Sequence, residues 1–110
     1  MSKYKSNKTV VDGITFDSKK EAERYCQLKL LEKAGKIKDL TLQYKFELQP
    51  SFKKNGKTFR AITYIADFTY LDLERMKNVV EDVKGYRTKE YQLKRKLFEY
   101  KFPYLTIVEV

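Results

Sequence analysis

The sequence predicts a single mixed α/β domain, in which a helix precedes a three-stranded meander, a second helix and a final strand. Three observations indicate this class: two segments show helical spacing of apolar residues, four show strand patterning, and the length of 110 residues suits one domain. Because the final strand follows a helical crossover, we expect it to run parallel to a meander strand, which gives a mixed central sheet.

The N-terminal residues predict a basic arm. Residues 1–9 contain three lysines and no acidic residue, so we interpret them as a flexible arm that precedes one domain over residues 10–110. The segment 10–16 is expected to be short and extended, with an Asp-Gly pair that favours a turn. No internal repeat or linker divides the rest of the chain.

The first predicted helix spans residues 18–34. Ser18 followed three residues later by Glu21 is typical of a capping box, and Gly35 is expected to end the helix. Glu21 also lies on the same helical stripe as Tyr25, which we expect to face the sheet. The residues alone leave two roles open for Glu21: a third carboxylate of a metal site, or the partner of Ser18 in the cap.

Alternation of apolar residues predicts three strands in the middle of the chain. They are expected over residues 40–50, 59–71 and 78–84. An Asn-Gly pair within residues 53–57 indicates a tight turn after the first of these strands. A loop over residues 72–77 connects the other two, so the three strands form a meander.

A second helix over residues 88–101 leads to the final strand over residues 104–110. At about 100° per residue, this helix presents an apolar arc that we expect to face the sheet. Lys94 lies within the arc, and two interpretations remain open for it: a contact with a substrate phosphate, or a stem that covers apolar surface. The arc consists of Leu93, Leu97 and Phe98.

Composition excludes several functions. The chain has no histidine and one cysteine, Cys26, which argues against zinc sites, catalytic imidazoles and an internal disulfide, and suits a cytoplasmic location. No apolar run is long enough to cross a membrane, and the N-terminus does not resemble a secretory signal. The formal net charge of +9 fits a nucleic-acid partner, and equally a soluble basic protein without one.

The sharpest functional signal lies on the second and third strands. If the loop between them is centred on residues 74–75, Asp67 lies directly opposite Asp82. Lys84, two residues further on, projects from the same face as Asp82. Opposed like charges destabilise a sheet, and a divalent cation such as Mg²⁺ would reverse that effect. A lysine beside the metal can stabilise developing charge, or position and deprotonate a water, during phosphodiester cleavage.

The alternative is that these acids simply face water on half-exposed strands. The apolar neighbours of Asp67 in Ile65-Ala66-Asp67-Phe68, and those of Asp82, argue for burial instead. Burial of unpaired carboxylates is unfavourable, so a metal site explains them better than a solvated surface does. Glu81 is expected to point to the opposite face and to be a bystander.

In this order, Asp67 followed by Asp82-Val83-Lys84 resembles the motif of the PD-(D/E)XK nuclease superfamily. The helix start at residues 16–23 resembles that of transposon end-cleaving endonucleases. The whole set is similar to a small phage-encoded family that is assigned to this nuclease fold and connected with recombination. Ala66 stands where the name of the superfamily has proline, a departure that many members share.

The resemblance implies a restriction-endonuclease-like core and a metal-dependent DNA endonuclease, with Mg²⁺ as the cofactor and Mn²⁺ as a substitute. It implies that Asp67 and Asp82 hold the metal together with Glu21. Lys84 completes the catalytic set by assisting the attacking water. The phage family further implies a structure-specific role on branched DNA, such as Holliday junctions, in recombination or replication. A homodimer is expected because symmetric cutting of two strands favours two-fold symmetry.

Further basic residues are expected to contact DNA phosphates without reading sequence. They lie at the predicted hairpin tip, just after the motif and in the second helix: Lys53, Lys54, Lys57, Arg60, Arg87, Lys89 and Lys94. Three alternatives remain: a non-catalytic DNA-binding module with the same fold, an RNA-binding basic protein, and a structural protein whose paired acids form surface salt bridges.

Overall fold

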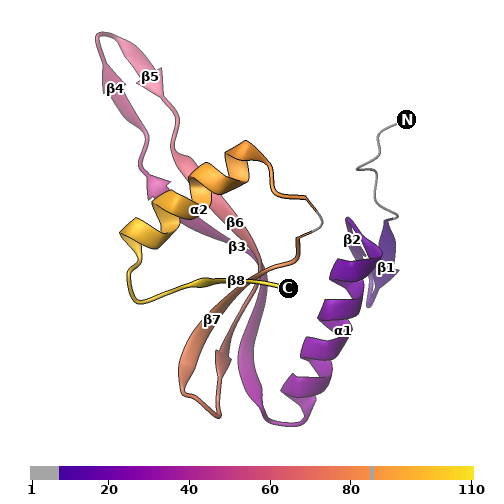
Figure 1. Ribbon diagram of the computed structural model, residues 1–110. Coiled ribbons are helices and arrows are strands. Elements are labelled where there is room, and N and C mark those ends of the chain that lie inside the picture. Colours follow the sequence, from indigo (N-terminus) through magenta and orange to yellow (C-terminus); the bar gives the residue numbers. More distant parts are fainter. Residues whose placement is uncertain (1–7, 85) are drawn as a thin grey trace.

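The computed structural model describes residues 8–84 and 86–110, so most of the predicted arm, together with Gly85, lies outside the described part (Figure 1). Within that part, two helices accompany a four-stranded sheet and two small hairpins, and neither helix is long and apolar enough to span a membrane. In chain order the elements are β1 (Thr9–Val11), β2 (Ile14–Phe16), α1 (Lys19–Lys33), β3 (Ile37–Gln49), β4 (Phe52–Lys54), β5 (Lys57–Phe59), β6 (Ile62–Asp72), β7 (Lys77–Asp82), α2 (Lys89–Lys101) and β8 (Ile107–Glu109).

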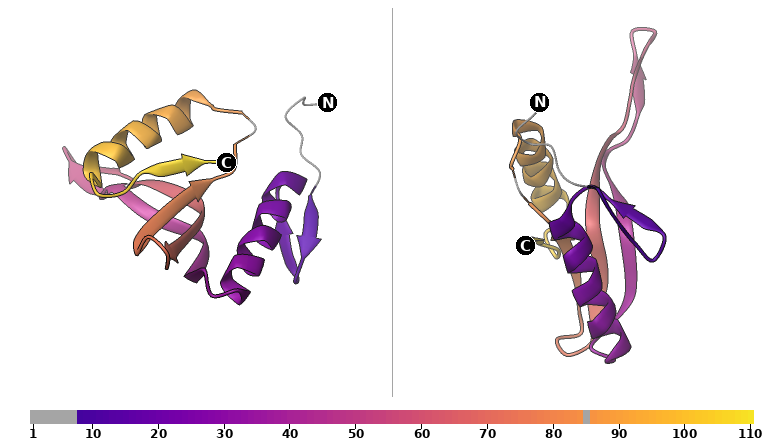
Figure 2. Two further views of the ribbon diagram at one scale, coloured as in Figure 1. Left: turned by 60° about the horizontal axis from the view of Figure 1, so that its bottom comes forward. Right: turned by 90° about the vertical axis from the view of Figure 1, so that its right-hand side faces the viewer.

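The central sheet has the strand order β3-β6-β7-β8. β3 and β7 both pair with β6 in antiparallel fashion, whereas β8 is parallel to β7. The predicted meander, helical crossover and mixed sheet are therefore confirmed. The hairpin β1–β2 lies beside α1, and the hairpin β4–β5 projects beyond the end of β3 and β6, as the views in Figure 1 and Figure 2 show.

Both helices begin at side-chain caps. Ser18 Oγ accepts a hydrogen bond from the backbone N–H of Glu21 at 3.1 Å, and Thr88 caps α2 in the same way. After α1, Gly35 has a φ of +75°, the left-handed conformation that closes many helices. Both predicted helices are thus confirmed to within one residue at each end.

Several strand boundaries differ from the prediction. β3 begins at Ile37, three residues earlier than expected, because pairing with β6 extends it to Ile37 opposite Asp72. The strand predicted over 59–71 is in fact two strands, β5 and β6, since β5 pairs with β4 and not with the sheet. The strand predicted over 104–110 is limited to β8, because β7 offers partners to that part alone. β1 begins at Thr9, which the sequence assigns to the N-terminal arm.

Two hydrophobic clusters, one against each helix, meet along β6. The cluster against α1 contains Phe68, whereas the cluster against α2 contains Tyr64 and Ala66. Asp67 therefore lies where β6 passes from one helix to the other. Gln43, which the register of β3 places opposite this point, has a positive φ of 56°. The packing thus brings an acidic residue to the boundary between the two clusters.

The apolar arc predicted for α2 is wrong at one position. Leu93 has 58% of its surface exposed, whereas Tyr91 and Phe98 are buried against the sheet. Aromatic rings bury more apolar area than leucine does, so the helix is oriented by its aromatic residues. Tyr91 belongs to the hydrophobic cluster between α2 and the sheet.

Candidate active site

Asp67 and Asp82 lie side by side at the end of the β6–β7 ladder. The last paired residues of this ladder are Phe68 and Glu81, and the next position in the same register brings Asp67 opposite Asp82. Asp67 Oδ2 accepts a hydrogen bond at 2.8 Å from the backbone N–H of Val83, the residue after Asp82. The predicted register is therefore confirmed, and the two carboxylates share one site.

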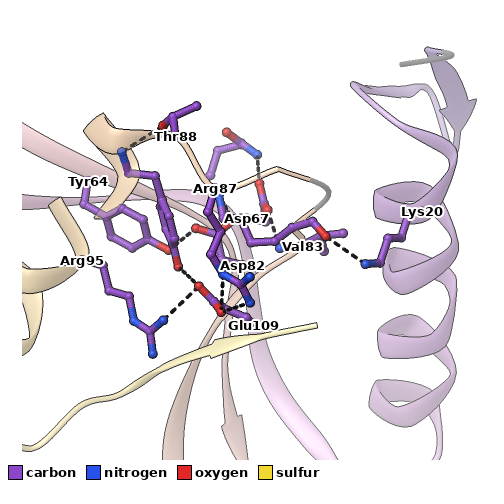
Figure 3. A network of polar contacts seen from close by, with 12 residues as sticks. Lys20, Tyr64, Asp67, Asp82, Val83, Arg87, Thr88, Arg95 and Glu109 are labelled. Carbon is purple, nitrogen blue, oxygen red and sulfur yellow. Dashed lines mark hydrogen bonds and ion pairs between the residues drawn. The ribbon is translucent and has the colours of Figure 1, made fainter. Parts of the chain in front are cut away.

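Asp82 is buried and has two side-chain partners. Lys84 Nζ lies 2.9 Å from Asp82 Oδ1, and the Tyr64 hydroxyl donates a hydrogen bond to Asp82 Oδ2 at 2.5 Å. Figure 3 shows the Tyr64 ring pointing from β6 toward Asp82. Burial and this hydrogen bond raise the pKa of Tyr64, which keeps its hydroxyl a neutral donor. Tyr64 is a site residue that sequence patterns do not distinguish from other core aromatics.

Asp67 has less compensation for its charge than Asp82. Burial and the neighbouring Asp82 carboxyl raise the pKa of Asp67 to about 7, and the charge of Glu21 acts in the same direction. The hydrogen bond from the Val83 N–H opposes this effect but does not cancel it. A half-buried carboxyl group whose pKa is raised by burial and by a neighbouring carboxyl group is the kind of group that occurs most often at functional sites.

Glu21 lies in the first turn of α1, half-buried and facing the same site. Burial and the charges of Asp17 and Asp82 raise the pKa of Glu21, whereas Lys84 lowers it. The backbone N–H of Glu21 takes part in the cap, but within the described part of the chain its carboxylate has no hydrogen bond or ion pair. The predicted reciprocal capping bond is therefore not formed, and the carboxylate remains within electrostatic reach of Asp82.

The three predicted metal ligands do not come together as one cluster. Across residues 8–84 and 86–110, no group of three or more acidic or cysteine side chains is arranged to hold a metal ion. Asp67 and Asp82 are adjacent, whereas Glu21 approaches from α1 without joining them. Two carboxylates are enough for Mg²⁺ when waters or substrate oxygens complete its coordination, so the donor set fits this cation.

A cavity of about 220 Å³ opens beside Asp82 and is bordered by both β6 and the first turns of α2. Lys84 and Lys94 both line it, so α2 brings Lys94 to the same cavity as Asp82. Lys84 Nζ also lies 3.8 Å from the centre of the Tyr91 ring, which holds the ammonium group over an aromatic face. Lys94 Nζ lies 3.3 Å from Glu90, an exposed partner that leaves it close to the cavity.

The other predicted DNA contacts fall into two groups. Arg87 is engaged at 2.6 Å by Glu109, which also receives Arg95 at 3.0 Å and the Tyr91 hydroxyl at 2.7 Å. These partners, Arg87 first, lower the pKa of Glu109 to about 2. They join α2 and the segment before it to β8, and Figure 3 shows Arg87 and Arg95 pointing toward Glu109. The remaining basic residues are exposed, at the start of α2 or around β4 and β5: Lys89, Lys53, Lys54, Lys57 and Arg60.

Glu81 lies on the opposite face of β7 from Asp82, as predicted, and it holds α1 against the sheet. Arg24 donates to both of its carboxylate oxygens, at 2.8 and 2.6 Å, and the Tyr70 hydroxyl donates a further hydrogen bond. Lys20 Nζ also connects α1 to this region, because it donates a hydrogen bond of 3.0 Å to the carbonyl oxygen of Lys84. These contacts fix the first half of α1, and with it the side of the helix that carries Glu21.

Comparison with protein families identifies the family to which the chain belongs. The model of a family described as "Protein of unknown function (DUF1064)" matches residues 1–109. The protein belongs to this family. Comparison with curated proteins gave no match, and comparison with solved structures gave none either.

Proposed function

We propose that this protein is a metal-dependent DNA endonuclease with a restriction-endonuclease-like core. The observation that carries the proposal is the pair formed by the half-buried Asp67 and the buried Asp82, two neighbouring carboxylates with Lys84 2.9 Å from one of them. Like charges in this arrangement oppose folding unless a cation neutralises them. Their position at the boundary between two hydrophobic clusters favours a catalytic role over a structural one.

Each residue of the site would have its own role in phosphodiester hydrolysis. A bound divalent cation would polarise a phosphate oxygen and acidify a water molecule. Asp67 and Asp82 would hold that cation, and the Tyr64 hydroxyl keeps Asp82 in its orientation. Lys84 is placed to stabilise negative charge that develops on the phosphate, or to assist the attacking water. Lys94, on the cavity wall, would contact a neighbouring phosphate.

We further propose branched DNA, such as a Holliday junction in phage recombination or replication, as the substrate. The resemblance of Tyr64-Ile65-Ala66-Asp67-Phe68 and Glu81-Asp82-Val83-Lys84-Gly85 to the phage-encoded nuclease-like proteins supports this choice. Two symmetric cuts would require two active sites, so we propose that a homodimer acts on such a substrate.

A cleavage panel tests the proposal. Purified protein is incubated with duplex, flap, fork and four-way-junction DNA in Mg²⁺, in Mn²⁺ and in EDTA. We expect metal-dependent cleavage that is strongest on a branched substrate and absent in Asp82→Ala. Binding of the same DNA without cleavage in either metal would contradict the enzyme and leave the DNA-binding module as the function.

One observation favours that non-catalytic alternative. Both oxygens of Asp82 already have protein partners, Lys84 and Tyr64, so this carboxylate is compensated without a metal. The RNA-binding alternative is tested in the same experiments by adding unlabelled RNA as a competitor. RNA that displaces branched DNA at equal concentration would indicate an RNA-binding protein.

A further inference from the structure

The hairpin β4–β5 is a slender arm that leaves the body of the protein. Its strands pair with each other and not with the central sheet, and every residue from Gln49 to Ala61 is exposed. In Figure 1 it projects beyond α2 and the ends of β3 and β6. Asn55 and Gly56 at its tip have positive φ values of 53° and 72°, which suits the tightest class of hairpin turn. The arm therefore contributes little to the core and is free to contact a partner.

The arm has one sign of charge. No acidic residue occurs between Pro50 and Ala66, a stretch that contains three lysines and one arginine. Lys54 is directly opposite Lys57 in the ladder, so two ammonium groups share one face next to the turn. Directly opposed like charges destabilise a two-stranded ribbon, and an anion between them would remove that cost. The placement of these lysines thus indicates a polyanion as the partner.

Two aromatic rings stiffen the base of the arm. Phe52 is opposite Phe59, and their rings stack with centroids 4.8 Å apart and an interplanar angle of 10°. Lys57 Nζ lies 5.4 Å from the Phe59 centroid. Each ring already stacks one of its two faces on the other ring. The pair is therefore poorly placed to stack on unpaired bases, which is the usual mode of single-strand binding. The pair instead keeps the ribbon straight on the same face that carries the opposed lysines.

We propose that the β4–β5 arm enters the major groove of B-form duplex DNA and holds the duplex on one side of the active site. The B-form major groove is about 12 Å wide and admits a two-stranded ribbon, whereas the major groove of A-form RNA is too narrow for side chains to enter. The statement that the arm lies on one side of the cut rests on the proposed endonuclease function. Binding of DNA by the arm does not depend on it.

The length of β6 sets the distance between arm and active site. Lys57 precedes Asp67 by ten residues, which at about 3.3 Å per residue corresponds to at most about 33 Å. One turn of B-form DNA is about 34–36 Å long. The arm would therefore contact the duplex up to about one helical turn from the scissile phosphate, so a substrate needs roughly that length of uninterrupted duplex on one side.

Binding measurements in EDTA test the arm without cleavage. Fluorescence anisotropy compares a DNA duplex of roughly 20 bp, two helical turns, with the RNA duplex and the single strand of the same sequence. We expect the DNA duplex to bind most tightly, and Lys54→Ala/Lys57→Ala to weaken its binding by about tenfold and to reduce the salt dependence by about two counterions. The matched control is Lys33→Ala/Lys36→Ala at the far end of α1, which removes the same charge and should change affinity less than about twofold.

The possible results distinguish a failure of the proposed DNA-binding arm from a failure of the proposed endonuclease. Equal losses in the two double variants, or equal affinity for duplex DNA and duplex RNA, would overturn the proposed arm. Circular dichroism checks that Lys54→Ala/Lys57→Ala is folded, which we expect because the arm lies outside both hydrophobic clusters. Normal arm-dependent binding without cleavage in Mg²⁺ would support the arm and contradict only the endonuclease.

Discussion

Glu81 and Asp82 are consecutive acids on β7, both buried and each paired with a basic side chain and a tyrosine hydroxyl, and they differ in whether a second carboxyl group lies beside them. Glu81 has 1% of its surface exposed and receives both a two-pronged ion pair from Arg24 and a hydrogen bond from Tyr70. Asp82 has 3% exposed and lies beside a second carboxyl group, that of Asp67. One acid is neutralised by the protein itself, and the other belongs to a pair with excess negative charge.

The difference separates a structural acid from a functional one. Arg24 comes from α1, so its ion pair with Glu81 connects this helix to β7. The charge of Glu81 is therefore neutralised without a ligand. Among the residues that the structure describes, only Lys84 forms an ion pair with the Asp67–Asp82 pair, and Glu21 adds a further negative charge nearby. A site that is incompletely neutralised in the free protein is one that a cation can complete.

The largest expected effect is on cleavage. Asp82→Asn keeps the shape of the side chain but removes its charge, and we expect it to lower Mg²⁺-dependent cleavage by about 10²–10³-fold while DNA affinity stays within a few fold. Glu81→Gln is the matched control on the other face, and we expect cleavage by it to stay within a few fold of wild type. Equal losses of cleavage in the two variants would remove the distinction between the faces.

The next effect is on stability, and here the Glu81 face of β7 matters more than the Asp82 face. Arg24→Ala leaves Glu81 buried without its counter-ion, and we expect the free energy of unfolding to fall by about 2–3 kcal/mol, after allowance for the exposed part of Arg24. Urea unfolding followed by circular dichroism measures this. The control is Lys29→Ala, which breaks the exposed ion pair with Glu32 in the same helix and should have no measurable effect.

A smaller effect of opposite sign is expected at Asp67. Its folded-state pKa of about 7 lies above the ordinary value of 3.8, so the metal-free folded protein binds a proton that the unfolded chain has lost. Stability in EDTA should therefore fall as pH rises from about 4 to 7 and level off above that. Asp67→Asn should remove this slope and be more stable than wild type at pH 8, by about 1–2 kcal/mol. A destabilised Asp67→Asn at pH 8 would show that Asp67 is a structural acid.

The fold and the central pair could be predicted because they depend on local periodicity. The period of two assigns Glu81 and Asp82 to opposite faces of one strand, and a short loop after Asp72 leaves few registers for β6 against β7. Once that register is fixed, Asp67 must lie opposite Asp82. The capping of α1 by Ser18 is equally local, and it too is confirmed.

The partners of these acids could not be predicted, because they depend on how the helices dock. Arg24 and Glu81 are 57 residues apart in the chain, and Tyr64 and Asp82 are 18 apart. Helical spacing also placed Leu93 in the core, whereas the packing of the aromatic residues on α2 turns it toward solvent. Tertiary packing decides which of several apolar stripes is buried, and a single sequence does not encode that choice in its spacing.

The most direct test of the central claim is thermal unfolding with and without Mg²⁺. If Asp67 and Asp82 bind the cation, Mg²⁺ at about ten times its Kd should raise the Tm of wild type by about 3–8 °C at pH 8, relative to NaCl of equal ionic strength. The rise should be absent in Asp67→Asn and in Asp82→Asn, and intact in Glu81→Gln. No rise in wild type, or an equal rise in all four proteins, would contradict a metal site at Asp67 and Asp82.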